Sequence, residues 1–209
     1  MRTLSLPRFL LDLTIASLLV ASNPALAKKE SFTSAIAGAV DELIDRYESI
    51  SLPAKGTVEV AFSPKGGCTA ATVRFIGEAK KSIRLAAYGL TSNPIGKALV
   101  EAKKRGVDVR AVLDREHNGK RDNPNSVANF LAANGIPVRI DKAVRIQHNK
   151  VIIVDGQSVQ NGSFNFTAAA QKSNAENIII HRGFPELAKT FTDNWNHLWS
   201  ESEDYKSSY

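Results

Sequence analysis

The 209-residue sequence is poor in cysteine, with Cys68 alone, so no disulfide can form within one chain. A chain without such a bridge must take its stability from a hydrophobic core, and this one is long enough to build one. We predict that Cys68 is a small buried residue near the start of a helix. An intermolecular disulfide is the alternative.

The sequence also lacks an apolar run long enough for a stable membrane anchor, which needs about 20 residues. The apolar stretch over residues 9–21 follows Arg2 and Arg8 and precedes Ala25-Leu26-Ala27, a pattern typical of signal-peptide cleavage sites. We therefore predict a signal peptide over residues 1–27 and a periplasmic or secreted protein without a membrane anchor after cleavage. An uncleaved anchor is the alternative.

No internal repeat, low-complexity segment or linker interrupts the sequence, which favours one domain after an N-terminal extension. Residues 28–50 place apolar side chains at helical spacing, with acidic residues on the other side. A packing or dimer-supporting helix fits this pattern better than a helix on an anionic membrane surface. We expect this helix and its connection over residues 28–56, and the domain over residues 57–209.

Strand and helix patterns alternate through the domain. The predicted strands are residues 58–62, 83–90, 107–113, 138–140 and 177–181, and the predicted helices are residues 69–81, 94–105, 126–134 and 185–199. Thr69 is the expected N-cap of the first helix. Residues 151–154 and 158–161 form a predicted hairpin around Asp155-Gly156. This alternation predicts an α/β fold with a mixed β-sheet flanked by helices.

The most specific pattern in the sequence is a set of six residues at fixed spacing: His148, Lys150, Asp155, Gly162, Ser163 and Asn165. His148 and Lys150 are two positions apart, so they project from the same face of an extended chain. The hairpin brings an imidazole, an ammonium, a hydroxyl and an amide to one rim of the sheet. Such donors, together with a potential nucleophile, suit a phosphate ligand.

This pattern resembles the HKD signature of the phospholipase D superfamily, and all its fixed positions match. The resemblance covers about residues 57–209, including 82–88, 103–109 and 204–209, and is to the small single-motif bacterial endonucleases of the Nuc type. It implies a phospholipase D-like fold that cleaves phosphodiesters.

The resemblance also implies a role for each motif residue. His148 would be the nucleophile, and Lys150, Ser163 and Asn165 would hold the phosphoryl oxygens. Glu176 would orient the imidazole of His148. Asp155 belongs to the signature, but its place at the hairpin turn favours a structural anchor over a proton donor.

A second HxK motif is missing, because none of His117, His181 and His197 stands in that context. Superfamily members with two motifs use the second histidine as general acid, so the resemblance implies a homodimer with a shared active site. One His148 would form a phosphohistidine while the partner's His148 protonates the leaving group. No metal or other cofactor is expected, because two lysines supply the positive charge.

The formal charge of +6 is consistent with a polyanionic substrate. The candidate phosphate contacts outside the motif are Lys142, Arg145, Lys120 and Arg121. We interpret His117 as part of a solvated loop, His181 as a satisfied core or rim histidine, and the pair Trp195 and Trp199 as core residues.

Together, these observations predict an exported, metal-independent, sequence-nonspecific endonuclease that cleaves DNA, with RNA as a further substrate. The first alternative is a phospholipase D that hydrolyses phospholipid headgroups through the same phosphohistidine chemistry. The second alternative is a nucleic-acid-binding module that has kept the fold without the activity.

Overall fold

The computed structural model describes residues 56–118 and 127–206. The predicted signal peptide and the predicted helix over residues 28–50 lie outside the described residues. Lys120 and Arg121 lie outside them as well.

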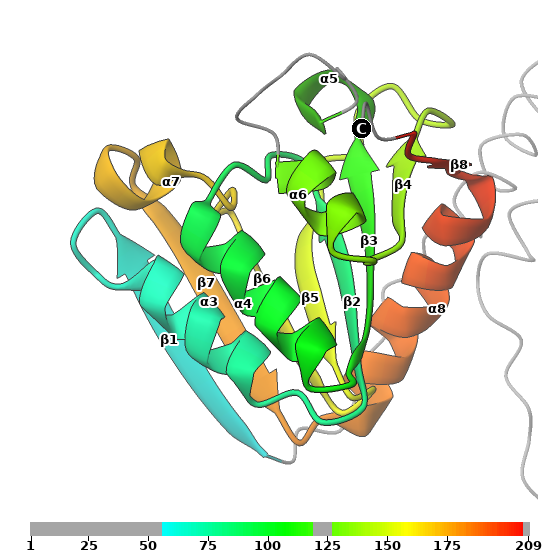
Figure 1. The fold of residues 1–209 in the computed structure, drawn as a ribbon. Helices are drawn as coiled ribbons and strands as arrows, with labels where there is room; N and C mark the ends of the chain where they lie inside the picture. Colours follow the sequence, from blue (N-terminus) through cyan, green and yellow to red (C-terminus); the bar gives the residue numbers. More distant parts are fainter. Residues whose placement is uncertain (1–55, 119–126, 207–209) are drawn as a thin grey trace, which may run out of the picture. The chain divides into compact units, whose positions relative to one another are not determined.

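An eight-stranded mixed sheet forms the centre of the described domain, in the order β1-β7-β6-β5-β2-β3-β4-β8 (Figure 1). The strands are β1 (Thr57–Ser63), β2 (Ser82–Ala87), β3 (Asp108–Asp114), β4 (Val138–Asp141), β5 (Lys150–Val154), β6 (Ser158–Gly162), β7 (Glu176–Arg182) and β8 (Glu203–Asp204). Strands β2, β3 and β4 are parallel neighbours, and the remaining pairs are antiparallel. The predicted mixed sheet is confirmed.

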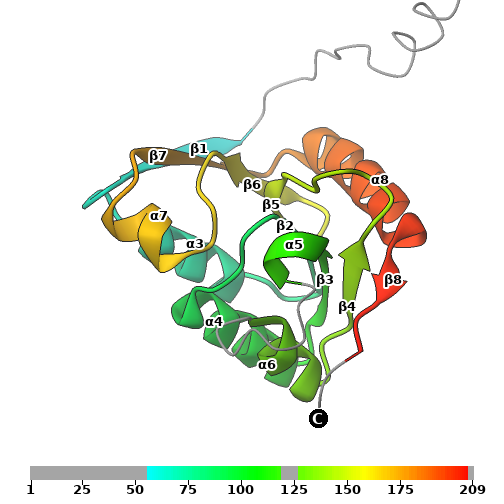
Figure 2. The ribbon, with the colours of Figure 1, turned by 90° about the horizontal axis from the view of Figure 1, so that it is seen from above.

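Helices cover the two faces of this sheet unequally. Helices α3 (Cys68–Gly77), α4 (Asn93–Lys104) and α6 (Val127–Ala133) lie on one face, and α8 (Pro185–Glu201) lies on the other (Figure 2). Two short helices, α5 (Arg115–Asn118) and α7 (Ala168–Lys172), follow strand ends and were not predicted. The sheet is therefore flanked by helices, as expected, but part of one face has no helix over it among the described residues.

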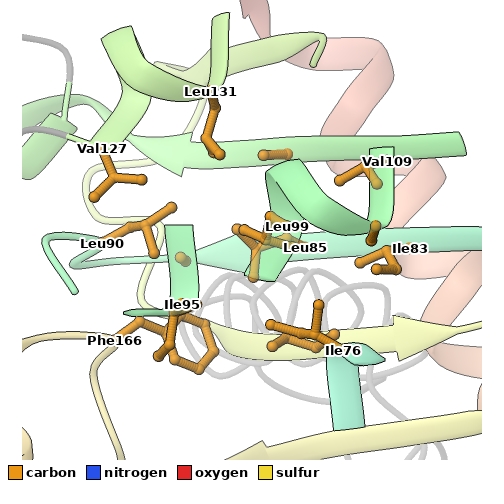
Figure 3. Packing of buried hydrophobic residues seen from close by; sticks show 14 of the residues in the cluster. Ile76, Ile83, Leu85, Leu90, Ile95, Leu99, Val109, Val127, Leu131 and Phe166 are labelled. Carbon is orange, nitrogen blue, oxygen red and sulfur yellow. The ribbon is translucent and has the colours of Figure 1, made fainter. Parts of the chain in front are cut away.

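The main core lies between the sheet and helices α3, α4 and α6. Ile83 and Leu85 of β2 pack there with Leu99 of α4, and Phe166 approaches Ile95 from the loop that follows the motif (Figure 3). Alternation along each strand sends the intervening residues to the opposite face. The motif loop is thus held by the same core that holds the sheet.

The prediction for Cys68 is confirmed, since this residue is fully buried at the first position of α3. The prediction for the tryptophans is also confirmed. Trp195 is buried under α8, its indole Nε1 donates a 2.8 Å hydrogen bond to the carbonyl oxygen of Leu85, and its ring stacks on Trp199 with centroids 5.0 Å apart. These two indoles pack the domain.

Helix α3 differs from its prediction at both ends. Its N-cap is Gly67, which has a positive φ of 82°, and the backbone N–H of Thr69 donates to Gln171. The prediction of Thr69 as the cap is therefore wrong. The helix ends at Gly77, before the expected Lys81, because the backbone N–H groups of residues 80 and 81 donate to the carboxylate of Asp155.

Candidate active site

All the motif residues except Asp155 gather at one rim of the sheet, where β2 and β3 end and β5 begins. Strand β5 runs antiparallel to β2, and Lys150 at its start pairs with Ala87 at the end of β2. The residues that follow β2 remain next to the motif, because the backbone N–H of Tyr88 donates a hydrogen bond to the carbonyl oxygen of Asn149. Gly89 in turn accepts a hydrogen bond from the N–H of Phe166. This pairing brings two distant segments of the motif together.

Lys150 is a buried cation at this rim, with 7 % of its surface exposed. Its Nζ donates a 2.8 Å hydrogen bond to the carbonyl oxygen of His148 and lies 5.1 Å from the centroid of the Tyr88 ring. Burial lowers the pKa of Lys150, and the carboxylate of Glu176 acts in the opposite direction. A buried ammonium of this kind attracts an anionic ligand.

His148 is exposed, but the backbone around it is fixed on both sides. The N–H of Gln147 donates to the buried carboxylate of Asp114, and the N–H of Asn149 donates to the side chain of Gln147. The imidazole lies against Tyr88, with ring centroids 4.6 Å apart. An accessible imidazole on a fixed backbone is suited to nucleophilic attack.

The end of β6 contributes a hydroxyl and an amide. Ser163 Oγ accepts hydrogen bonds from the backbone N–H and the side-chain amide of Asn177, so its own proton is left for another acceptor. Asn165 has a buried Oδ1 without a hydrogen-bond partner among the described residues. Gly162 permits this loop, because a Cβ there would lie 2.3 Å from the Asn177 carbonyl oxygen.

Asp155 belongs to the signature, yet it lies at the other end of β5. Its carboxylate accepts hydrogen bonds from the backbone N–H groups of Lys80, Lys81 and Ser82. Burial opposes ionisation, but these three hydrogen bonds outweigh it, so the pKa of Asp155 lies below its ordinary value. With about 3.4 Å per residue in a strand, five residues separate it from Lys150 by about 17 Å. Within the protomer, Asp155 therefore acts as a structural anchor that ties the end of β5 to the start of β2.

Glu176 stands at the start of β7, near the motif. Its carboxylate accepts a 3.1 Å hydrogen bond from Asn174 and acts electrostatically on Lys150. Among the described residues no hydrogen bond joins Glu176 to His148. The predicted orientation of the imidazole by Glu176 stays a prediction.

The two described candidates for phosphate contacts lie between β4 and β5. Lys142 pairs with Glu203 and lines a hollow of about 290 Å³ with Arg115 and Lys206. Arg145 is exposed in the same connection, three residues before His148. Neither is in contact with the motif lysine, so their roles stay predictions.

Sequence reasoning missed two aromatic residues at the rim. Tyr88 contacts His148 and Lys150. The Tyr88 ring also packs against the ring of His117, with centroids 4.0 Å apart and the two rings tilted. His117 therefore belongs to the short helix α5 at the site, and its interpretation as part of a solvated loop is wrong. No local signal could have revealed this, since Tyr88 precedes His117 by 29 positions.

The interpretation of His181 also needs correction. His181 lies half-buried on β7, its ring edge-on to Phe184 with centroids 5.4 Å apart. Its Nδ1 is buried without a hydrogen-bond partner among the described residues, and burial lowers the pKa of this histidine. The prediction that the hydrogen-bonding groups of His181 are satisfied is therefore wrong for Nδ1.

Residues 56–118 and 127–206 contain no group of three or more histidine, cysteine or acidic side chains that could hold a metal ion. None of the helices in these ranges is both long enough and apolar enough to span a membrane.

An exposed imidazole beside a buried ammonium, with a hydroxyl and an amide from a neighbouring strand end, is an arrangement suited to phosphoryl transfer. Residues 72–199 match the family model for the phospholipase D-like domain of cardiolipin synthase. The chain therefore belongs to the phospholipase D superfamily and is one of its phosphodiesterases.

Three proteins of known name are similar to this chain. The phospholipase D of Rickettsia conorii is 42% identical over 157 residues, which are 75% of this chain and 76% of that protein. The structure of Nuc from Salmonella typhimurium, a phospholipase D family member, has 44% identity and a TM-score of 0.69, covering 73% of this chain and all of that one. NucT from Helicobacter pylori shares the fold, with 20% identity and a TM-score of 0.66 over 72% of this chain and all of the other.

Proposed function

We propose that this protein is an exported endonuclease that cleaves DNA or RNA without a metal ion. The observation that carries the proposal is the gathering of the motif's imidazole, ammonium, hydroxyl and amide at one rim, with the buried Lys150 beside the exposed His148. The resemblance to the single-motif nucleases of the Nuc type and the likeness to the Nuc structure support a nucleic acid as the substrate. The positive formal charge suits the same polyanion.

The proposed reaction has two displacements at phosphorus. An imidazole nitrogen of His148 attacks, the bond from phosphorus to the leaving oxygen breaks, and a protonated imidazole donates its proton to that oxygen. Lys150, Ser163 and Asn165 stabilise the charge on the non-bridging oxygens. Water, deprotonated by the same imidazole that gave the proton, then releases the phosphate from His148.

The second imidazole comes from a second copy of the chain in this proposal. The described residues form one motif, and the reaction requires an acid that is distinct from the nucleophile. A two-fold dimer brings the partner's His148 to the same phosphate. Within one protomer, we assign Glu176 to the support of the ammonium of Lys150, because the negative charge of its carboxylate raises the pKa of that lysine against the effect of burial.

An exposed apolar face supports a dimer. Val58, Val60 and Phe62 are 55%, 50% and 61% exposed and alternate along β1 on the face of the sheet opposite α3; we call them the β1 stripe. Figure 2 shows α8 on this face beside β6, β5 and β4, away from β1. The β1 stripe reaches the active-site rim, since Phe62 pairs with Asn177, which holds Ser163. Burying this stripe against its copy would join the two rims.

A second candidate function is the hydrolysis of phospholipid headgroups. The relatives from Rickettsia species are named phospholipase D. Val144 and Ile146 are 42% and 41% exposed in the connection that leads to His148, where they could meet lipid tails. The nuclease is preferred, because the similarity to the Nuc structure covers all of that chain.

One assay separates these functions. The purified protein is incubated with supercoiled plasmid and, separately, with phosphatidylcholine vesicles, both in excess EDTA. We expect nicked and linear plasmid, with no choline released. The variant His148→Asn should be inactive in both assays, which excludes a contaminating enzyme. Choline release without plasmid cleavage would replace the nuclease with the lipase, and DNA binding without cleavage would indicate a binding module.

A further inference from the structure

The ring of His117 packs against the ring of Tyr88 in a tilted arrangement, directly beside His148. The two centroids are 4.0 Å apart with an interplanar angle of 36°, and His117 is exposed while Tyr88 is half-buried. Tyr88 also contacts His148, with centroids 4.6 Å apart. The exposed ring of His117 and the imidazole of His148 therefore both contact the ring of Tyr88.

This arrangement is held by a buried carboxylate. Asp114, which is 1% exposed, accepts hydrogen bonds from the backbone N–H groups of Glu116 and His117 through Oδ1. Its Oδ2 accepts the N–H of Gln147, the residue before His148. The side chain of Asn118 donates a 2.6 Å hydrogen bond to the Tyr88 carbonyl oxygen. One carboxylate thus fixes the backbone of His117 relative to the backbone of His148.

His117 also borders the part of the rim that receives the phosphate in the proposed function. A Cβ on Gly89 would lie 3.8 Å from Cδ2 of His117 and 3.9 Å from Cβ of Asn165. Gly89 therefore lies next to both His117 and Asn165, the residue that carries the motif amide. A nucleotide whose phosphate lies on Lys150 and Asn165 would have its sugar and base within reach of the exposed imidazole.

We propose that His117 is a specificity-determining contact on which a base of the nucleic acid next to the scissile phosphate stacks. This inference rests on the proposed nuclease function. Tyr88 supports the imidazole from below, so that the stack of base, His117 and Tyr88 holds the nucleoside beside His148. Base stacking on an aromatic side chain requires no hydrogen-bond readout, so the contact favours nucleic acid over lipid without selecting a sequence.

The experiment uses an oligothymidylate with a single phosphodiester at its centre, all other linkages being uncharged methylphosphonates. Two analogues carry an abasic residue on one side or the other of that phosphodiester. Steady-state kinetics are measured for the parent protein and for His117→Ala, His117→Phe and His117→Gln. Circular dichroism and light scattering establish that each variant keeps its fold and oligomeric state.

We expect the parent to cleave the full oligonucleotide about 10-fold more efficiently than one of the abasic analogues, a ratio within the range of one stacked base. His117→Ala and His117→Gln should remove this preference by raising KM for the full oligonucleotide, and should leave the rate on that analogue unchanged. His117→Phe should keep the preference, because phenylalanine stacks without donating a proton.

Three outcomes would overturn the inference. An equal loss on the full oligonucleotide and both analogues, with His117→Phe as damaged as His117→Ala, would mean that His117 contacts the phosphate or transfers a proton. Unchanged kinetics in all three variants would mean that His117 does not touch the substrate. A parent without preference for the full oligonucleotide over either analogue would likewise exclude base stacking. A parent that cleaves none of these substrates, nor plasmid, would instead refute the nuclease function itself.

Discussion

Lys150 Nζ donates a 2.8 Å hydrogen bond to the carbonyl oxygen of His148, so the cation is attached to the backbone of the nucleophile. This geometry holds the ammonium next to the backbone that carries the imidazole. Because Lys150 is buried, its charge is not screened by water as that of a surface lysine would be. Its contribution should therefore appear in the chemical step.

Replacing Lys150 by alanine should lower kcat on plasmid DNA by about 10²- to 10³-fold, the scale of losing one oxyanion-stabilising donor. The matched control is Lys142→Ala, since Lys142 is exposed and pairs with Glu203 at the edge of the rim. This control should mainly raise KM and reduce the slope of log Kd against log salt by about 1. Equal losses of kcat in the two variants at saturating DNA would contradict this division of roles.

Activity should persist in excess EDTA, because the ammonium of Lys150 supplies positive charge at the phosphate. The measurement is plasmid nicking after dialysis against chelator, with and without added Mg²⁺. Complete loss in EDTA that Mg²⁺ restores would mean that a metal ion takes part in the reaction.

The β1 stripe predicts the position of the dimer interface. Phe62→Asp should convert a dimer into a monomer by light scattering and abolish nuclease activity, because a charge cannot be buried there without a partner. Phe130→Asp is the control, since Phe130 is 42% exposed on α6, on the other face of the sheet. A parent protein that is monomeric and fully active would refute the shared site.

The shared site also predicts the behaviour of mixed dimers. Wild-type protein is unfolded and refolded with an excess of a tagged His148→Ala variant, and the heterodimers are isolated through the tag. They should be inactive or nearly so, because each phosphate needs one imidazole as nucleophile and another as acid. Heterodimers with half of the wild-type activity would show that each protomer works alone.

The anchor at Asp155 predicts a pH-dependent contribution to stability. Asp155→Ala should lower the free energy of unfolding by about 2 to 3 kcal/mol at neutral pH, because backbone N–H groups lose a charged acceptor. The pKa of Asp155 is lowered on folding, so this contribution is complete above the unfolded pKa and is lost as pH falls through the folded one. Urea denaturation should therefore give a smaller difference between parent and variant below about pH 4.

Asp193→Ala provides the control for that measurement. Asp193 forms an exposed ion pair with Lys189 on α8, and such pairs contribute about 0.5 kcal/mol or less. A loss of the same size in the two variants would show that Asp155 is an ordinary surface carboxylate.

The elements that the sequence predicted well are those with local signals. Helix α4 begins at Asn93 and ends at Lys104, within one residue of prediction, because Pro94 and Gly106 mark its ends. The hairpin was found from Asp155-Gly156, and both residues have the positive φ that its turn requires. The motif residues other than Asp155 also meet at one rim, because alternation along a strand is enough to place them.

The features that were missed depend on contacts between distant segments. Helix α5 begins where the carboxylate of Asp114 accepts hydrogen bonds from two backbone N–H groups. Helix α7 begins where Thr167 Oγ1 accepts a hydrogen bond from the N–H of Ala170. Each is too short for a hydrophobic period to reveal. His117 could not be assigned to the site for the same reason, since only the folded chain brings it against Tyr88.

The anchor at Asp155 also explains why the number of residues between Lys150 and Asp155 matters. One end of β5 is fixed at Lys80–Ser82, and the other end presents Lys150 beside the end of β2. Inserting or deleting a single residue between them would turn Lys150 to the opposite side of the sheet, since side chains alternate along a strand. We therefore expect Asp155 to be required in an active protein although its hydrogen bonds are to the backbone at the start of β2, because it fixes the register that places Lys150 at the rim.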